Sequence, residues 1–166
     1  LNVQLSANKQ FFYLHSNHES PYEQHFYRLP VKGGEMTQLT TGRGKHEATL
    51  SPDEKWLAIL HSTANRPTEL YVQANQPGAR AKQITQSQTA AFAAYPWREP
   101  EIIEVPASDG AKVPARLYKP TGKNNGAAVI FVHGAGYLQN VHHWWSQYYR
   151  EYLFHHLLAA QGYTVL

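Results

Sequence analysis

The sequence contains no cysteine and only one methionine, and it has few charged residues. Without cysteine there can be no disulfide, no cysteine-ligated zinc and no thiol nucleophile. Charged residues make up 16% of the 166 residues, the net charge is +3, and the basic side chains are scattered along the chain. A nucleic-acid-binding domain normally gathers its basic residues in a stripe or patch, so no nucleic-acid partner is expected.

Long apolar runs are also missing. The longest extends from Ala127 to Val132, far short of the roughly 20 apolar residues that a membrane-spanning helix needs. The chain starts at Leu1 without a methionine or a charged segment followed by an apolar one, so a signal peptide either lies upstream or does not exist. It ends in the strand-like residues Tyr163 to Leu166. We therefore expect both ends to be internal to a longer protein, with a short natural protein as the alternative.

What is abundant is aromatic and apolar. There are 11 Tyr, 6 Phe and 4 Trp, and hydrophobic residues make up 42% of the chain. This composition predicts a folded globular protein, because disordered chains have too few apolar residues to form a core. The aromatic content favours β-rich packing over a helical bundle.

The first half contains a repeat with a period of about 45 residues. Leu5-Ser6 returns as Leu50-Ser51, and Gln38-Leu-Thr40 returns as Gln83-Ile-Thr85, both at a spacing of 45. A period of this length with several short strands in each unit is typical of β-propeller blades. The alternative is two pairs of hairpins from a β-sandwich, which we favour less because the period holds across separate elements. Two blades cannot close a ring, so further units are expected upstream.

Turn residues divide the second repeat unit into strands. Ser51-Pro-Asp-Glu54 predicts a tight turn, because proline fixes φ and the aspartate side chain accepts backbone hydrogen bonds. Trp56 to Leu60 then reads as a buried strand, and Asn65-Arg-Pro67 as a second turn. Glu69 to Gln73 is predicted to be the next strand, ending at the turn Asn75 to Gly78.

The pattern changes after Tyr95, where prolines punctuate the chain and the repeat is lost. Glu101 to Pro106 and Lys112 to Tyr118 are predicted to form a hairpin around Ser108-Asp-Gly110. Ala127 to Val132 is apolar and β-branched, as expected for a central parallel strand buried on both faces. We therefore predict β-propeller blades over residues 1–95 and a second domain over residues 96–166.

A helix and a further strand follow the apolar run. Trp144 to Gln161 has helical spacing, with Gly162 as the C-terminal cap. Tyr163 to Leu166 begins the next strand. Strand, helix and strand in succession predict a βαβ unit.

The most informative string for chemistry follows the predicted central strand and consists of His133, Gly134, Ala135, Gly136 and Tyr137. In α/β-hydrolases the loop after this strand supplies a backbone N–H to the oxyanion hole. Such donors must point at the oxygen that becomes negative in the tetrahedral intermediate. The alternative is a glycine-rich turn that serves only the connection from strand to helix.

Taken in order, these features resemble the prolyl oligopeptidase family, in particular its dipeptidyl-peptidase-like bacterial members. The resemblance rests on the blade motif Ser51-Pro-Asp-Glu-Lys-Trp56, the segment Pro114 to Pro120 and the stretch His133 to Gly162. It implies β-propeller blades followed by the N-terminal part of an α/β-hydrolase domain. It also implies peptide substrates, no cofactor or metal, and a Ser-His-Asp triad with its serine in a Gly-x-Ser-x-Gly turn.

This sequence contains no Gly-x-Ser-x-Gly. The resemblance places the triad later in the chain, so the 166 residues are expected to be inactive alone. Where many relatives have an oxyanion-binding tyrosine, this chain has His133. Its side chain, a backbone N–H near Ala135, or Tyr137 could serve instead. The alternatives are an esterase or acylaminoacyl hydrolase on the same scaffold and a non-catalytic binding protein. The resemblance admits a homodimer of the full-length protein and suggests a periplasmic or secreted location, with a cytoplasmic one left open.

Ten histidines are unusual for this length, and they include two adjacent pairs and one cluster. These are His142-His143, His155-His156, and His15 with His18 and His25. None has the spacing of a zinc site, and adjacent side chains on a helix point in different directions, so packing is the expected role. Ser108 and Ser146 lack flanking glycines and are expected to be structural. Packing is also expected of Trp97, Trp144 and Trp145.

Overall fold

The computed structural model describes residues 3–134, 136 and 138–166. The chain forms two compact units, which are described separately below. The first unit comprises residues 1–93 with 143–145, and the second comprises residues 94–142 with 146–166. Strands dominate, as the aromatic composition predicts.

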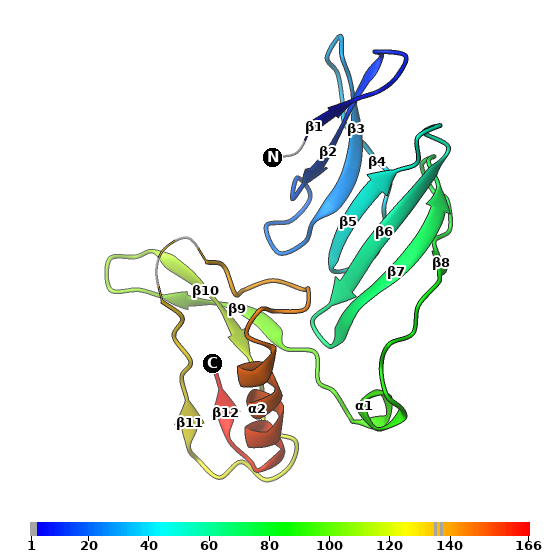
Figure 1. Cartoon of the computed structure of the whole chain (residues 1–166). Helices are drawn as coiled ribbons and strands as arrows, with labels where there is room; N and C mark the ends of the chain where they lie inside the picture. The colour runs from blue at the N-terminus through cyan, green and yellow to red at the C-terminus, as the bar shows by residue number, and fades with distance from the viewer. Residues whose placement is uncertain (1–2, 135, 137) are drawn as a thin grey trace. The chain divides into compact units, whose positions relative to one another are not determined.

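The first unit consists of two four-stranded sheets, each of them an antiparallel meander in which the strands follow sequence order (Figure 1). The first sheet contains β1 (Val3–Leu5), β2 (Phe11–Ser16), β3 (His25–Pro30) and β4 (Thr37–Gln38). The second sheet contains β5 (Lys45–Leu50), β6 (Trp56–Thr63), β7 (Arg66–Ala74) and β8 (Lys82–Gln83). Two successive four-stranded meanders are the blade-type arrangement that the repeat predicts.

The turn between the first two strands of each sheet explains why the repeat is visible in the sequence. Ser51 Oγ donates to Asp53 Oδ1 at 2.6 Å and accepts from the Trp56 backbone N–H at 3.0 Å. At the same position of the first sheet, Ser6 Oγ donates to Asn8 Oδ1 at 2.8 Å. A short polar side chain that bonds its own backbone is the reason these residues recur at turns.

One turn of the second sheet lies earlier than predicted. The turn occupies residues 64–65, whereas Arg66 and Pro67 already belong to β7. Proline has no N–H to give to the ladder, so it is tolerated at a strand end or at a bulge. The register between β6 and β7 shifts between His61 and Thr63, close to this proline.

A shared core joins the two sheets of the first unit. Its buried side chains come from both sheets and are Tyr13, Phe26, Leu39, Ala48, Leu57 and Ile59. Buried polar groups are paired across it: the Gln73 amide donates to the Leu39 carbonyl at 2.7 Å, and His15 Nε2 accepts from the Ala48 N–H at 2.9 Å. Burial of large apolar side chains is the main stabilising term for such a pair of sheets.

The second unit contains a hairpin and a short parallel pair of strands. The hairpin is β9 (Glu101–Pro106) with β10 (Lys112–Leu117), as predicted, and the parallel pair is β11 (Ala128–Val129) with β12 (Thr164–Val165). Tyr118 and Val165 exchange two backbone hydrogen bonds, at 2.8 and 3.0 Å, which join the two pairs in the order β9-β10-β12-β11. The predicted strand-helix-strand succession is therefore present.

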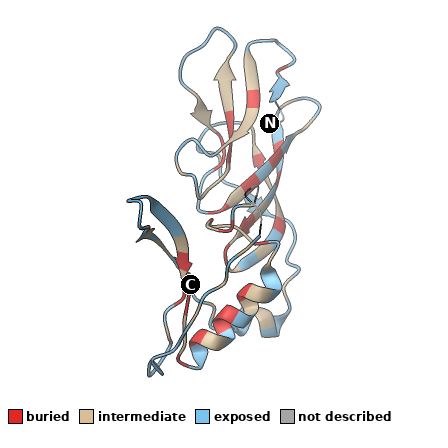
Figure 2. Cartoon of the chain, turned by 90° about the vertical axis from the view of Figure 1, so that its left-hand side faces the viewer, coloured by how far each residue is buried: buried red, intermediate tan, exposed pale blue. Residues whose placement is uncertain are grey.

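Two helices are described. The five-residue α1 (Ala90–Ala94) ends at the first residue of the second unit, and α2 (Tyr149–Ala160) connects β11 to β12. Figure 2 shows the buried positions of α2 interspersed with exposed ones; the buried residues are Tyr152, His155, His156 and Ala159. No helix among the described residues is long and apolar enough to cross a membrane.

The ends of α2 differ in how well they were predicted. The helix begins at Tyr149 and not at Trp144, because Ser146 Oγ accepts the Tyr148 N–H at 3.0 Å and forms a turn instead. Its C-terminal end is as predicted. Gly162 has φ +93, and the N–H of Tyr163 donates to the Leu158 carbonyl at 3.1 Å, which is a Schellman cap.

The predicted central strand was wrong in extent and burial. Of the run from Ala127 to Val132, only residues 128–129 form β11, while Ile130 and Val132 are 69% and 82% exposed. The reason is that β11 has a described partner, β12, along one edge only. A parallel strand becomes buried on both faces only when strands flank it and helices cover it.

Candidate functional site

The candidate oxyanion loop begins where β11 ends. Backbone hydrogen bonds continue past the strand, since the Phe131 N–H donates to the Leu166 carbonyl at 2.7 Å. The backbone therefore runs beside the carboxyl end of β12 as far as Phe131. Ligands of open α/β sheets bind at the carboxyl ends of parallel strands, so this loop lies at the edge where a site is expected.

The described residues of this loop offer backbone groups to a ligand and do not form an assembled catalytic centre. His133 Nδ1 lies 3.2 Å from the carbonyl oxygen of Gly134. A Cβ built on Gly134 or on Gly136 would meet no atom within 4 Å, so open space surrounds both. Ala135 and Tyr137 lie outside the described residues. The backbone at Gly134 and Gly136 is therefore open to the approach of another molecule.

A cavity of about 410 Å³ adjoins the loop within the second unit. It is lined mainly by apolar side chains of the hairpin and of the segment after β11, and His133 is among the lining residues. Its buried polar residues are Arg116, Asn140 and His155, which are 7%, 9% and 6% exposed. An apolar cavity with a few polar groups is the usual form of a small-molecule site.

Next to this cavity, the ring of Tyr118 packs against two histidines of α2. Tyr118 is 2% exposed, and burial raises its pKa to about 12. Its ring makes edge contacts with His155 and His156 at centroid distances of 5.5 and 5.1 Å. Burial, followed by the positive charge of Arg116, lowers the pKa of both histidines to about 4. Both are therefore neutral at ordinary pH, and their role is packing.

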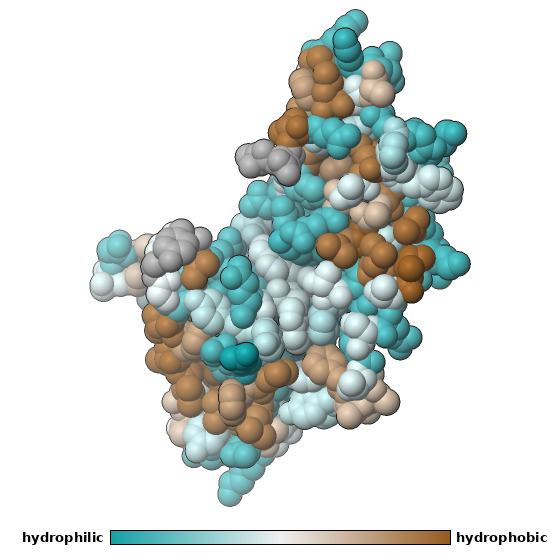
Figure 3. All heavy atoms as spheres, viewed as in Figure 1, coloured by the Kyte–Doolittle hydropathy of each residue, from teal (hydrophilic) through white to brown (hydrophobic). Residues whose placement is uncertain are grey.

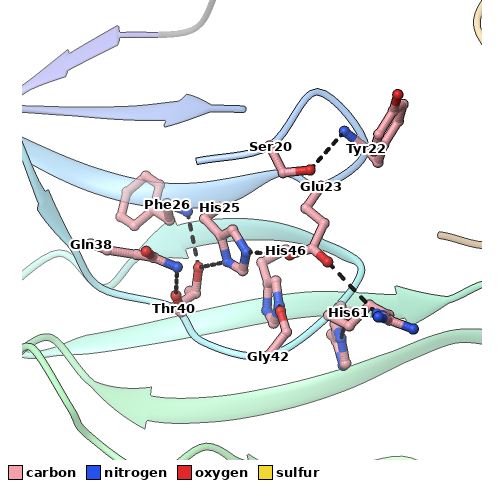
Figure 4. Close-up of polar contacts among 11 residues, drawn as sticks. Ser20, Tyr22, Glu23, His25, Phe26, Gln38, Thr40, Gly42, His46 and His61 are labelled. Carbon is pink, nitrogen blue, oxygen red and sulfur yellow. Dashed lines mark hydrogen bonds and ion pairs between the residues drawn. The ribbon is translucent and has the colours of Figure 1, made fainter. Parts of the chain in front are cut away.

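Three histidines stack in the first unit, and the sequence did not indicate this group. His46 lies between His25 and His61, with ring centroids 4.7 and 4.2 Å apart and nearly parallel planes (Figure 4). The predicted cluster was different: His15 bonds the backbone of the second sheet, and His18 packs on the Tyr27 ring. The hairpin register pairs His46 with His61, so the turn between β5 and β6 was the signal that could have found them.

Polar contacts hold the histidine stack at one end, His25, and in the middle, at His46. His25 Nδ1 lies 3.3 Å from Thr40 Oγ1, and its Nε2 lies 3.4 Å from Glu23 Oε2 (Figure 4). The Gly42 carbonyl lies 3.1 Å from Nε2 of His46. Burial, and then the neighbouring His61, lowers the pKa of His46 to about 3. The stack holds the two sheets together and presents ring faces rather than converging nitrogens.

The remaining candidates have structural surroundings. Ser146 is 4% exposed and its hydroxyl accepts the Tyr148 N–H. Trp97 packs against the ring of His156 with centroids 4.9 Å apart. The Trp145 N–H donates to Ser62 Oγ at 3.3 Å. These contacts agree with the packing roles expected from the sequence. Among residues 3–134, 136 and 138–166, no group of three or more His, Asp or Glu side chains is placed to hold a metal ion.

Comparisons with known proteins fit this geometry. Residues 2–68 match the family described as the dipeptidyl peptidase IV N-terminal region. The crystal structure of Porphyromonas gingivalis dipeptidyl peptidase 4 superposes with a TM-score of 0.78 over 99% of this chain, at 20% identity. The chain spans 23% of the length of that protein. The first match supports the resemblance to dipeptidyl peptidases over residues 2–68, and the second shows a shared fold.

Proposed function

We propose that this chain is part of a serine peptidase of dipeptidyl- or oligopeptidase type. In this proposal residues 1–95 are propeller blades, and residues 96–166 are the N-terminal portion of an α/β-hydrolase domain. The observation that carries it is the succession of two blade-type meanders, one of which lies in the matched region, and the unit β11-α2-β12, which adjoins the β9–β10 hairpin in the strand order β9-β10-β12-β11. Peptides are the proposed substrates of the full-length protein.

The proposed reaction passes through an acyl-enzyme. A serine outside these 166 residues attacks the peptide carbonyl, a histidine oriented by an aspartate takes the serine proton, and water later releases the acyl group. The segment from His133 to Tyr137 contributes to the oxyanion hole. Its donor is a backbone N–H near Ala135, the side chain of His133, or the hydroxyl of Tyr137.

Single substitutions in the full-length protein separate these donors. Removing one oxyanion donor lowers kcat by about 10²- to 10³-fold. H133A and Y137F should therefore be compared using a chromogenic dipeptidyl amide as substrate. A fall of that size in one variant identifies its side chain as the donor. Unchanged kcat in both assigns the role to the backbone. A full-length protein that does not hydrolyse dipeptidyl amides at all would contradict the peptidase proposal.

A further inference from the structure

A buried arginine connects three parts of the second unit. Arg116 on β10 is 7% exposed. Its Nη1 donates to the Asn140 carbonyl at 3.5 Å, and its Nη2 donates to the Tyr118 hydroxyl at 3.2 Å. Its Cζ lies 4.3 Å from the ring centroid of Tyr152 on α2. Strand β10, the segment that follows the candidate oxyanion loop, and helix α2 therefore meet at one guanidinium.

The Asn140 carbonyl is the point at which this group holds the chain. It accepts from Arg116 and also from the Tyr152 hydroxyl, the latter at 3.2 Å. Asn140 and Tyr152 are 9% and 7% exposed, so water competes little for these hydrogen bonds. A carbonyl oxygen has two lone pairs, and here donors from two different elements use both. The backbone at Asn140 is thus fixed from β10 and from α2.

The same helix holds the chain on the other side of the loop. The Phe131 N–H donates to the Leu166 carbonyl at 2.7 Å. The Phe131 ring contacts the rings of Tyr152 and His155, with centroids 6.4 and 5.4 Å apart. Tyr152 therefore contacts the chain both before and after the loop. Residues 132–139 run between two points that are fixed on this tyrosine.

The arrangement is not one that stability alone would favour. Among the residues that the structure describes, no carboxylate forms an ion pair with Arg116, and its Nε has no hydrogen-bond partner. The adjoining cavity is lined mainly by apolar side chains, and Figure 3 shows apolar residues gathered over the side of the second unit where β11 lies. An apolar side chain of similar length is often the more stable occupant of such a position. Exceptions of this kind are expected at functional sites.

We propose that Arg116 and Tyr152 are positioning residues for the oxyanion loop, His133 to Tyr137. They fix the backbone at Asn140, and through it they hold the donor of the loop where the oxyanion forms. A donor held in advance needs no reorganisation during the reaction, and a displacement of about 1 Å can lower the rate by about 10²-fold. The inference rests on the proposed function and gives neither residue a contact with the substrate.

The experiment uses the full-length protein and three substitutions. R116M keeps a long side chain but removes the charge and every donor, whereas Y152F keeps the ring and removes only the hydroxyl. R150M removes an exposed arginine of α2 and is the matched control. The kcat and KM are measured with a chromogenic dipeptidyl amide. Rates are expressed per active site titrated with a fluorophosphonate, so that a loss of folded protein does not count as a loss of kcat.

The expected result is a fall in kcat at nearly constant KM. R116M should lower kcat about 10- to 10²-fold and change KM by less than about twofold, because the loop acts on the transition state. Y152F should lower kcat about 3- to 10-fold, since it loses one hydrogen bond. R116K, which restores the charge without the planar fork, should fall between R116M and the unmodified protein. R150M should match the unmodified protein.

A merely structural role would reduce the number of titrated sites and leave kcat per site unchanged. Unchanged kcat per site in R116M and Y152F, or a rise in KM in place of the fall in kcat, would overturn the inference. If R116M does not fold, Y152F decides by the same criterion. An unmodified protein that turns over no dipeptidyl amide contradicts the proposed function and this inference with it. An active protein with unchanged variants contradicts this inference alone.

Discussion

Acidification should weaken the first unit through His46. Its ring is stacked between those of His25 and His61, and burial lowers its pKa from 6.5 to about 3. At a pH between about 3 and 6.5, the unfolded chain binds a proton at this histidine and the folded chain does not. The stability contributed by neutral His46 is thus present above pH 6.5 and is lost as the pH falls toward 3.

The size of the effect follows from the two pKa values. For a group that titrates at 6.5 when unfolded and near 3 when folded, lowering the pH from about 7 to about 5 reduces the free energy of unfolding by about 2 kcal/mol. The second stacked neighbour adds to the loss, because burial also lowers the pKa of His61. A protonated His46 would bring a positive charge against two imidazole faces in the interior.

The assay is urea unfolding followed by far-UV circular dichroism at the two pH values. H46Q keeps a polar side chain but does not titrate in this range, so it should lose about 2 kcal/mol less than the unmodified chain on acidification. H18Q, at an exposed site in the loop before β3, should behave as the unmodified chain does. Equal losses in the unmodified chain and H46Q would refute the reasoning.

Two further substitutions test how the blades are held. Gly44 and Gly42 both have positive φ, but only at Gly44 would a Cβ collide with a backbone atom, the carbonyl oxygen of Ser62. G44A should therefore lower the free energy of urea unfolding by about 1–3 kcal/mol more than G42A does, and equal effects would exclude the clash. Buried Glu69 accepts from the N–H and the hydroxyl of Ser87, both at 2.7 Å. E69Q should speed hydrogen exchange in residues 84–88, whereas the exchange of β2 stays unchanged; unaltered exchange in 84–88 would show that the carboxylate does not hold this segment.

Sequence reasoning succeeded where the determining interactions are local. The blade turns were predictable because the side chains of Ser51 and Asp53 bond their own backbone. The end of α2 was predictable because only glycine readily adopts the φ of Gly162. The hairpin of β9 and β10 followed from its turn residues. In each case the signal lies within a few consecutive residues.

Sequence reasoning failed where packing between residues far apart in the sequence determines the structure. The run from Ala127 to Val132 is apolar enough for a buried strand, yet its burial depends on neighbours that the described residues do not supply. The start of α2 was missed because the apolar spacing of Trp144 and Trp145 continues that of the helix. The burial of Arg116 could not be predicted from the sequence. An arginine in a strand is ordinarily exposed, and the burial of this one depends on α2 and the loop before it.

The most direct test of the peptidase proposal is labelling with a serine-reactive fluorophosphonate. The 166-residue chain and the full-length protein are treated in parallel, and intact masses are measured. We expect stoichiometric labelling of the full-length protein at a serine within Gly-x-Ser-x-Gly and no labelling of the 166-residue chain. Stoichiometric labelling of the chain alone, or an unlabelled full-length protein, would contradict the account.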